Sequence, residues 1–454
     1  MSRFAFYDFE TTGISPAFDQ PLQFAAILTD EDFAPLETVD VRCRLAPHVL
    51  PSPMALAVTG VTPAMLTDPS LVSWSEFSGE ISGKIKEWAP ATWVGYNSLS
   101  FDENVMRQMF YQNLHPNIFQ TQTGGNDRMD VMRVVYAVWV LARDVLEWPK
   151  DEKGRISFKL DRLAPASGFT EHDAHDALGD VRATIYILSL IRDRAPEVYA
   201  RCLRNRDKDS IKADLRSGQP MMLIERFGAA PPRQYAGVFA GQNPQNPNAL
   251  GFLDLEACNP ADLIDASDDA LFRAVDGTPK LIRTVAANQT PNLFPITEPS
   301  PESEARAALV ASRPDFQDRV GLALSHRFAD RPEPVHVEEQ IYSGFFTEND
   351  KGVLREFQAA DWEQRVRLLD TFEDQRLLQL GRRVVYANAP ALLSEEYRNL
   401  ASGSINARWN ANDPETPWTN RKKVQSELQD LEAGNLVSGE VLEEMKRFYG
   451  SLFR

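Results

Sequence analysis

The sequence contains little cysteine and no excess of positive charge. Its 454 residues include three cysteines, Cys43, Cys202 and Cys258, which lie far apart and form no C-x-x-C pair. This usage argues against a disulfide framework or a zinc site and fits a reducing cytoplasm. The formal net charge is −17. Nucleic-acid-binding proteins usually carry a basic footprint, so a protein of this charge would need a local basic stripe to bind one.

Long apolar runs are also absent. No stretch of about eighteen or more apolar residues occurs, so we expect no transmembrane helix and no membrane partner. The first residues predict a strand with acidic side chains, which is not the pattern of a signal peptide. A cytoplasmic location is therefore expected. The length predicts two to four domains, and 43% hydrophobic residues suffice for well-formed cores.

The stretch 3–13 reads as a buried strand that carries two carboxylates. Asp8 and Glu10 share one parity with Phe4 and Phe6, and side chains along a strand alternate between faces. The two acids therefore project from one face, where they repel each other unless a proton or a cation intervenes. Oxygen ligands suit Mg²⁺ or Mn²⁺. The alternative is a strand end with two solvated acids.

A third acid, Asp102, follows the predicted strand at 92–97 and stands where a helix would begin. A carboxylate there can cap the helix or lie in its first turn. It can equally be a further acid of a metal site at the edge of the sheet. The position alone does not decide between these interpretations.

His175 and Asp180 precede an apolar helical stretch at 185–191. Five residues along a helix correspond to about 140° of rotation, so two helical side chains at this spacing would not share a face. If His175 lies in the loop before the helix, both can point into one cleft. Histidine titrates near neutrality and is a candidate general base beside a metal cluster, although a lone histidine is usually structural or exposed.

The rest of the chain divides by its periodicity. Strands are expected at 22–30 and 38–45, and helices at 74–88 and 130–147. Short strands separated by turn residues predict a small β-barrel or sandwich, at 221–227, 235–240, 249–255 and 280–286. A proline-rich connector at 291–301 follows. Helices are then expected at 302–327, 347–357, 359–380, 391–401 and 420–452.

These motifs, in this order, resemble the DEDDh exonucleases. The resemblance is closest to the bacterial exonuclease I family, in the stretches 6–11 (FYDFET), 23–27 (QFAAI), 95–97 (GYN), 101–102 (FD), 174–177 (AHDA) and 342–346 (YSGFF). It implies an α/β ribonuclease-H-like exonuclease domain with a mixed sheet at 1–192. It further implies an SH3-like β-barrel domain with extra helices at 193–345 and a C-terminal helical domain at 346–454.

The resemblance also implies residue roles. Asp8, Glu10 and Asp180 match the metal-binding positions, Asp102 the remaining catalytic acid, and His175 the general base. Two Mg²⁺ ions, or Mn²⁺ in their place, are the expected cofactors, because phosphodiester hydrolysis needs both an activated water and relief of charge on the leaving oxygen. Asp176 is interpreted as an acid at the start of the helix.

Substrate-binding positions follow from the same resemblance, at Glu10, Thr11, Arg107, Phe158, Lys159 and Lys208. At position 159 the family has an arginine that contacts substrate. Lysine keeps the charge there but loses the planar two-pronged donor. Lys208 lies in a basic stretch at 201–216 whose charges alone would fit a solvated helix end.

The implied function is 3′→5′ hydrolysis of single-stranded DNA in repair and recombination, by a monomer that works with single-stranded-DNA-binding protein. One alternative is a DEDDh exoribonuclease, because recognition of the 2′-hydroxyl depends on pocket shape and not on the motifs. Another is a non-catalytic single-stranded-DNA-binding scaffold. The long C-terminal half favours exonuclease I over small ribonucleases, and all five motif residues argue against a scaffold.

Overall fold

The computed structural model describes residues 3–170, 176–326 and 333–453. The chain forms two compact units, each built from separated segments. The first unit comprises Met1–Asn126, Glu171–Arg182 and Glu333–Arg454, and the second comprises Asp127–Thr170 and Ala183–Pro332. The three consecutive domains expected from the sequence, with boundaries at 192 and 345, stay a prediction.

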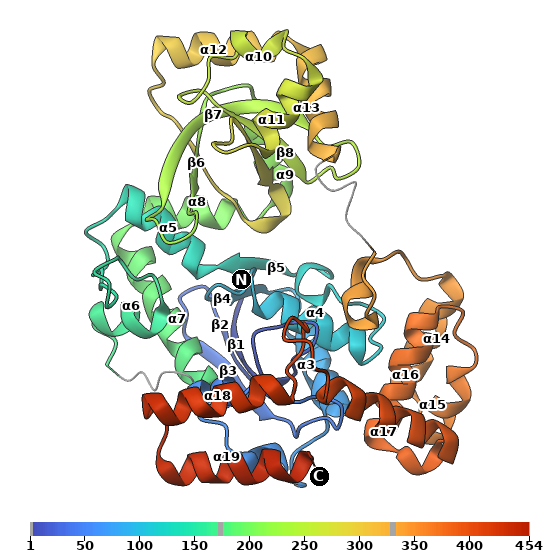
Figure 1. The fold of residues 1–454 in the computed structure, drawn as a ribbon. Helices are drawn as coiled ribbons and strands as arrows, with labels where there is room; N and C mark the ends of the chain where they lie inside the picture. The colour runs from blue at the N-terminus through green and yellow to red at the C-terminus, as the bar shows by residue number, and fades with distance from the viewer. Residues whose placement is uncertain (1–2, 171–175, 327–332, 454) are drawn as a thin grey trace. The chain divides into compact units, whose positions relative to one another are not determined.

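A mixed sheet organises the first unit (Figure 1). The strands of the sheet that belong to this unit are β1 (Phe4–Thr11), β2 (Pro21–Thr29), β3 (Pro35–Arg42) and β4 (Thr92–Gly95), in the order β3-β2-β1-β4. The strand β2 pairs antiparallel with β1 and β3, whereas β4 runs parallel to β1. This sheet confirms the strands predicted near 3–11, 22–30, 38–45 and 92–97 and the ribonuclease-H-like α/β class.

Helices and short turns complete the N-terminal part of this unit. They are α1 (Pro53–Thr59), α2 (Pro63–Leu66), α3 (Trp74–Trp88), α4 (Asp102–Gln112) and η1 (Gln120–Gln122). The predicted helix at 74–88 is confirmed as α3, where Ser73 and Glu76 form a reciprocal capping box. Phe77, Ile81 and Ile85 repeat at helical spacing on its buried face and join the aromatic core of the sheet.

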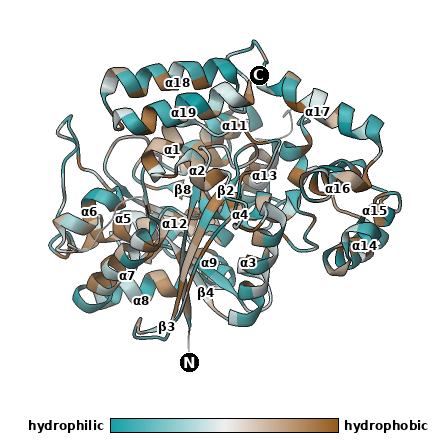
Figure 2. Cartoon of the chain, turned by 90° about the horizontal axis from the view of Figure 1, so that it is seen from below, coloured by the Kyte–Doolittle hydropathy of each residue, from teal (hydrophilic) through white to brown (hydrophobic). Residues whose placement is uncertain are grey.

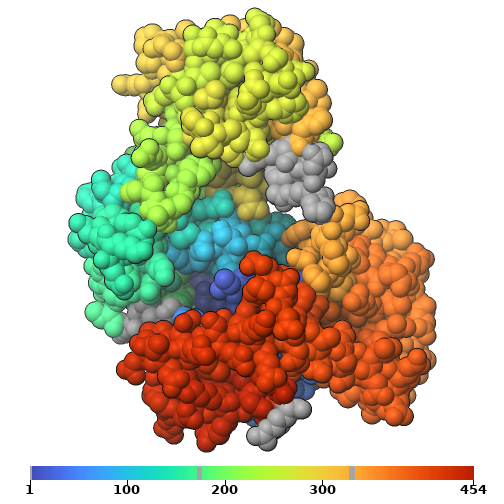
Figure 3. Space-filling model, in the orientation of Figure 1, coloured from blue at the N-terminus to red at the C-terminus, as the bar shows by residue number. Residues whose placement is uncertain are grey.

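The C-terminal segment of the first unit is helical. Its elements are η3 (Val337–Tyr342), α14 (Glu348–Ala359), α15 (Trp362–Leu369), α16 (Gln375–Asn388), η4 (Pro390–Leu392), α17 (Glu395–Trp409), α18 (Arg421–Gly434) and α19 (Gly439–Leu452). Apolar residues of α18 and α19 form one core with those of α1 and α2. Much of α18 and α19 is hydrophilic and teal in Figure 2, and the red C-terminal part of the chain that contains them lies on the face of the molecule drawn in Figure 3.

Two single helices predicted in this segment are wrong. The stretch 420–452 forms two helices, because Asn435 adopts a left-handed conformation that ends α18 and Ser438 caps α19. The stretch 359–380 is likewise divided: α15 ends at Leu369, and Asp374 caps α16. Apolar periodicity continued across both breaks, while the capping residues set the actual ends.

The second unit contains an antiparallel sheet with helices. Its sheet order is β10-β6-β7-β8-β9, from β6 (Met221–Glu225), β7 (Arg233–Gln242), β8 (Ala249–Asp254), β9 (Ile282–Ala286) and β10 (Asn292–Pro295). The four short strands predicted from the sequence are confirmed, and their arrangement fits the expected SH3-like barrel. The strand β10 corrects the predicted connector at 291–301, because Asn292–Pro295 pairs with β6.

The other elements of the second unit are β5 (Asp127–Asp130), α5 (Val131–Leu141), α6 (Leu160–Ala166), α8 (Pro196–Arg204), α9 (Lys208–Arg216), α10 (Ala261–Ile264), α11 (Asp268–Asp276), η2 (Ala287–Gln289), α12 (Pro301–Ala311) and α13 (Pro314–His326). Helix α7 (Ala177–Arg194) begins in the first unit and continues into the second. The helix predicted at 130–147 is wrong beyond Leu141, because Ala142 leaves helical geometry and Val145 and Leu146 are buried without it. The helix predicted at 302–327 is two helices, α12 and α13.

A buried ion cluster stabilises the C-terminal helices. Glu338, 1% exposed, accepts hydrogen bonds at Oε1 from Arg383 at 2.8 Å and from Arg408 at 2.6 Å. Burial alone would raise the pKa of Glu338, but the two guanidinium groups overcome it and hold the pKa at about 2. The stabilisation is therefore present above the ordinary pKa of glutamate and is lost as the pH falls toward about 2.

Replacing Glu338 with alanine is expected to lower the free energy of unfolding by about 3–5 kcal/mol, because two partly buried guanidinium groups would lose their shared partner. Urea denaturation at neutral pH measures this loss. The matched control is Glu415→Ala, which removes an exposed carboxylate. Equal unfolding midpoints for the two variants would show that the cluster contributes nothing to stability.

Candidate metal and active site

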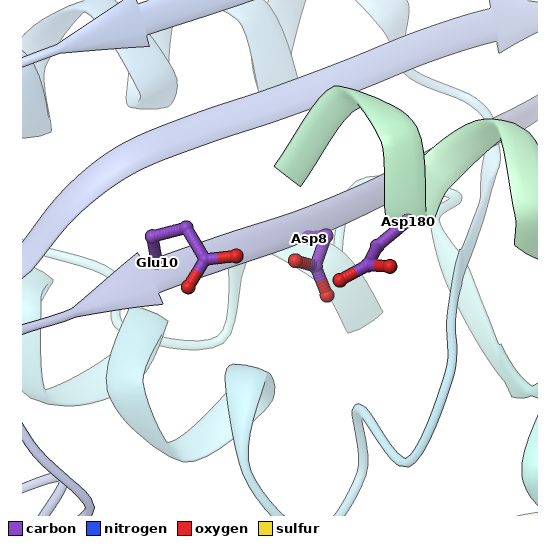
Figure 4. A group of neighbouring side chains, drawn as sticks. All are labelled: Asp8, Glu10 and Asp180. Carbon is purple, nitrogen blue, oxygen red and sulfur yellow. The ribbon is translucent and has the colours of Figure 1, made fainter. Parts of the chain in front are cut away.

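Three carboxylates meet at the end of β1. Asp8, Glu10 and Asp180 each offer one oxygen such that these atoms all lie within 4.8 Å of one another. Asp8 and Glu10 project from the same face of β1, and Asp180 reaches toward Asp8 from the first turn of α7 (Figure 4). The face shared by Asp8 and Glu10, predicted from strand parity, is confirmed, and the structure brings all three predicted metal ligands together.

This end of β1 pairs with β2 but not with β4. The strand β4 pairs with β1 only from Phe4 to Phe6, so Asp8 and Glu10 lie beyond its last paired residue. Gly95 ends β4 in close approach to β1: a Cβ there would lie 3.1 Å from the carbonyl oxygen of Tyr7 and 2.5 Å from the Cβ of Ser98. Glycine thus allows the chain to turn away beside the carboxylates.

Burial and mutual repulsion strongly disfavour ionisation of these acids. Burial raises the pKa of Glu10 to about 9, with further contributions from the charges of Asp180 and Asp102. Burial also raises the pKa of Asp8 well above its usual range, and Asp102 and Asp180 add to the shift. A group of acids that lowers its energy by retaining protons would also lower it by binding a cation.

The donor set therefore fits a divalent cation. All three groups are carboxylates, the hard oxygen ligands that Mg²⁺ and Mn²⁺ prefer, and they come from two rigid elements, β1 and α7. Among the residues that the structure describes, this is the group of acids, histidines and cysteines with suitable spacing. Asp8, Glu10 and Asp180 could thus hold a metal ion.

Asp102 lies beside this cluster but is not one of its three close ligands. It is the first residue of α4, is 3% exposed, and raises the pKa of both Asp8 and Glu10 through its charge. The capping position before it belongs to Phe101, which makes no side-chain cap. Asp102 is thus a first-turn residue and, at the same time, an acid within electrostatic reach of the cluster. The first-turn interpretation is confirmed, and a role for Asp102 as a further acid of a metal site stays a prediction.

A second buried acid, Glu103, was not predicted from the sequence. It is 1% exposed and accepts hydrogen bonds from Tyr7 Oη at 3.1 Å, from Thr121 Oγ1 at 3.0 Å and from Arg107 Nη2 at 3.3 Å. These contacts connect the start of α4 to β1, on the face opposite Asp8. The only signal in the sequence was its position, four residues before Arg107 on the same helix.

The contacts of Asp176 confirm the prediction that it is an acid at the start of a helix. Its Oδ2 accepts from the backbone N–H of Gly179 at 3.3 Å, in the first turn of α7. Its Oδ1 accepts from Arg42 at 3.3 Å and from Gln23 at 3.1 Å, which connects α7 to β3 and β2. These contacts hold α7 against the sheet and so position Asp180. The predicted general base, His175, lies outside the described residues.

Two predicted substrate-binding residues of the first unit, Thr11 and Arg107, make hydrogen bonds to other residues of the protein. Thr11 is buried, and its hydroxyl donates to the carbonyl oxygen of Gly13 at 2.7 Å. Arg107 donates to Glu103 and, at 3.4 Å, to the hydroxyl of Tyr342, and its guanidinium lies 5.2 Å from the ring centre of Phe119. Substrate contacts by either residue stay a prediction.

Glu10 belongs to the acid cluster described above, and the remaining substrate-binding candidates lie in the second unit. Lys159 is exposed and precedes α6, and Phe158 beside it is 2% exposed and packs among aromatic rings. Lys208 is exposed in the first turn of α9. Contacts of these residues with substrate likewise stay a prediction.

Comparisons with known proteins cover nearly the whole chain. The family model described as Exonuclease matches residues 5–188, and the model described as Exonuclease I C-terminal domain matches residues 335–451. Exodeoxyribonuclease I of Haemophilus influenzae is 31% identical over 83% of this chain and 84% of its own length. Exodeoxyribonuclease I of Escherichia coli is 28% identical over 84% of each.

Solved structures that resemble this chain belong to the same family as the relatives above. Exonuclease I from Methylocaldum szegediense has a TM-score of 0.84 at 26% identity over 100% of both chains. Escherichia coli exonuclease I in complex with a dT13 oligonucleotide has a TM-score of 0.82 at 26% identity over 99% of both. The acids Asp8, Glu10 and Asp180 all fall within the segment matched by the exonuclease model. The chain belongs to the exodeoxyribonuclease I family and is an exodeoxyribonuclease.

Proposed function

We propose that this protein is a metal-dependent exonuclease that degrades single-stranded DNA from its 3′ end to nucleoside 5′-monophosphates. The observation that carries the proposal is the convergence of Asp8, Glu10 and Asp180 within 4.8 Å, in a chain of this family. The complex of the Escherichia coli relative with a dT13 oligonucleotide supports a single-stranded substrate.

The chemistry of each side chain determines the role that we propose for it. Asp8, Glu10 and Asp180 would hold two Mg²⁺ ions, with Mn²⁺ as a substitute, and Asp102 would add negative charge beside them. Bound ions supply an acidified water and neutralise charge on the leaving oxygen. His175 is assigned as the general base that accepts the proton of the attacking water at a ring nitrogen, because imidazole titrates near neutral pH.

The biological setting belongs to the same proposal. A solved structure described as single-stranded-DNA-binding protein (SSB)/Exonuclease I supports that protein as a partner. We further propose that the enzyme acts as a cytoplasmic monomer in DNA repair and recombination. None of the described helices is long and apolar enough to cross a membrane.

The test is a digestion series with purified protein. Single-stranded DNA, duplex DNA and single-stranded RNA, each labelled at the 5′ end, are incubated with Mg²⁺ or with EDTA. The proposal predicts stepwise shortening of single-stranded DNA with Mg²⁺ alone, release of nucleoside 5′-monophosphates and survival of RNA. Digestion of RNA with survival of DNA would support the exoribonuclease. Binding of single-stranded DNA without cleavage would support the scaffold.

A further inference from the structure

A cavity of about 400 Å³ in the second unit collects positive charge. Its basic lining residues are Lys153, Arg155, Lys159, Arg162 and Arg226. The acids that line it are Asp151 and Glu152. This sign is opposite to that of the whole chain, whose net charge is −17. The cavity is therefore a local basic site of the kind that an acidic protein needs to bind a polyanion.

Ion pairs within the cavity leave three of its cations without a carboxylate. Arg155 pairs with Asp151 at 2.7 Å, and Arg162 lies 4.0 Å from Glu152. Lys153, Lys159 and Arg226 have no ion-pair partner among the described residues. Of these three, Arg226 alone carries a planar guanidinium, which matches the geometry of a phosphate group with two parallel donors.

Neighbouring groups hold Arg226 in place. Its guanidinium carbon lies 4.7 Å from the ring centre of Phe158, at cation–π distance. Its Nε donates to the carbonyl oxygen of Ala230 at 3.0 Å, and its Nη1 donates to the hydroxyl of Tyr136 at 3.2 Å. Its Nη2 makes no hydrogen bond to any described residue. Nη2 is therefore available to donate to a ligand, and the contacts of Nε, Nη1 and the Phe158 ring hold the guanidinium in its orientation.

The ring beneath Arg226 is itself rigidly placed. Phe158 is 2% exposed and lies edge-on to Tyr136 and Trp139, with ring centres 5.4 and 5.5 Å away. Trp148 lies 5.7 Å from it. Because the rings cannot easily rearrange, little side-chain freedom remains for Arg226 to lose when it binds a ligand. Lys159, the next residue after Phe158, lines the same cavity.

We propose that Arg226 is a substrate-binding residue that shares one backbone phosphate of single-stranded DNA with Lys159. Arg226 supplies the planar donors, and Lys159 supplies a mobile point charge. The proposal rests on the proposed function, since it takes the bound polyanion to be the substrate. It explains how a site with lysine at position 159 can still present a guanidinium to phosphate.

The experiment measures binding without cleavage. Fluorescence anisotropy with a 5′-labelled oligo(dT) in EDTA gives the Kd at several salt concentrations, for the wild type, Arg226→Ala and the control Arg273→Ala. Arg273 is exposed on α11 and does not line the cavity. Loss of a charge-assisted phosphate contact is expected to raise Kd by about ten-fold or more. The slope of log K against log salt should become less negative by about 0.7.

Two further variants make the proposal sharper. Arg226→Lys keeps the charge and loses the planar donors, so it should bind more weakly than the wild type with an unchanged salt slope. Adding Lys159→Arg to Arg226→Ala should restore most of the affinity by returning a guanidinium to the cavity. Failure of this rescue would contradict a shared phosphate. If Arg226→Ala does not fold, Arg226→Lys decides alone.

An Arg226→Ala protein that binds like the wild type, or no worse than Arg273→Ala, would overturn the proposal. So would full affinity in Arg226→Lys. Failure of the proposed function gives a different result: the wild type would bind the oligonucleotide in EDTA and would not shorten it when Mg²⁺ is added. Binding measured without metal therefore separates the two outcomes.

Discussion

Replacing Asp180 with asparagine is expected to abolish hydrolysis of single-stranded DNA while leaving the protein folded. The variant removes one of three carboxylates that converge within 4.8 Å. If the lost charge stabilisation is about 4 kcal/mol, the rate falls about a thousand-fold. Single-turnover digestion of a 5′-labelled oligonucleotide with Mg²⁺ measures this loss.

The matched control is Asp193→Asn, which makes the same change on the exposed part of the same helix, α7. It should digest DNA at the wild-type rate. The Asp180→Asn protein should melt at or above the wild-type temperature in EDTA, because the charge of Asp180 raises the pKa of Asp8 and of Glu10. A nearly wild-type rate in Asp180→Asn would disprove its assignment as a metal ligand.

The thermal stability of the protein is expected to depend strongly on both divalent metal and pH. Burial raises the pKa of Glu10 to about 9 and that of Asp8 well above its usual range. The folded, metal-free protein therefore retains protons that the unfolded chain releases above about pH 4.5. The contribution of these two carboxyl groups to stability is therefore greatest below that pH and is lost as the pH rises toward about 9.

A divalent cation should reverse this loss, because it replaces the protons. At a hundred-fold excess over its Kd, a cation that binds only the folded protein adds about 2.7 kcal/mol. Melting curves with EDTA and with Mg²⁺, at about pH 6 and about pH 8, should show a larger Mg²⁺ shift at the higher pH. In the double variant Asp8→Asn, Glu10→Gln both the pH slope and the Mg²⁺ shift should disappear. An equal Mg²⁺ shift in that variant would place the cation elsewhere.

Strand parity made it possible to predict from the sequence that Asp8 and Glu10 lie side by side. Asp8 and Glu10 are two residues apart on a strand, so they share a face whatever surrounds them. Asp180 needed the longer motif with His175, because helical rotation alone does not relate it to β1. Glu103 was missed because its role depends on Tyr7 and Thr121, which reach it only in the folded chain.

The fold was predictable where the spacing of apolar residues or the presence of turn residues marks an element. Apolar spacing located α3 to the residue, and turn residues separated the strands β6 to β9. Helix ends were less predictable, because Asn435 and Ala142 stop helices inside apolar patterns that continue past them. The strand β10 was hidden among prolines, since it is short and its partner β6 lies about seventy residues away along the chain.

Anomalous X-ray scattering from crystals soaked in Mn²⁺ shows directly whether Asp8, Glu10 and Asp180 bind a divalent cation. Mn²⁺ replaces Mg²⁺ at oxygen-ligand sites and can be located without reference to activity. We predict anomalous peaks contacted by carboxylate oxygens of Asp8, Glu10 and Asp180, and weaker or absent peaks in Asp180→Asn. Peaks only elsewhere, or none at these residues under conditions that support DNA hydrolysis, would contradict the assignment of this site.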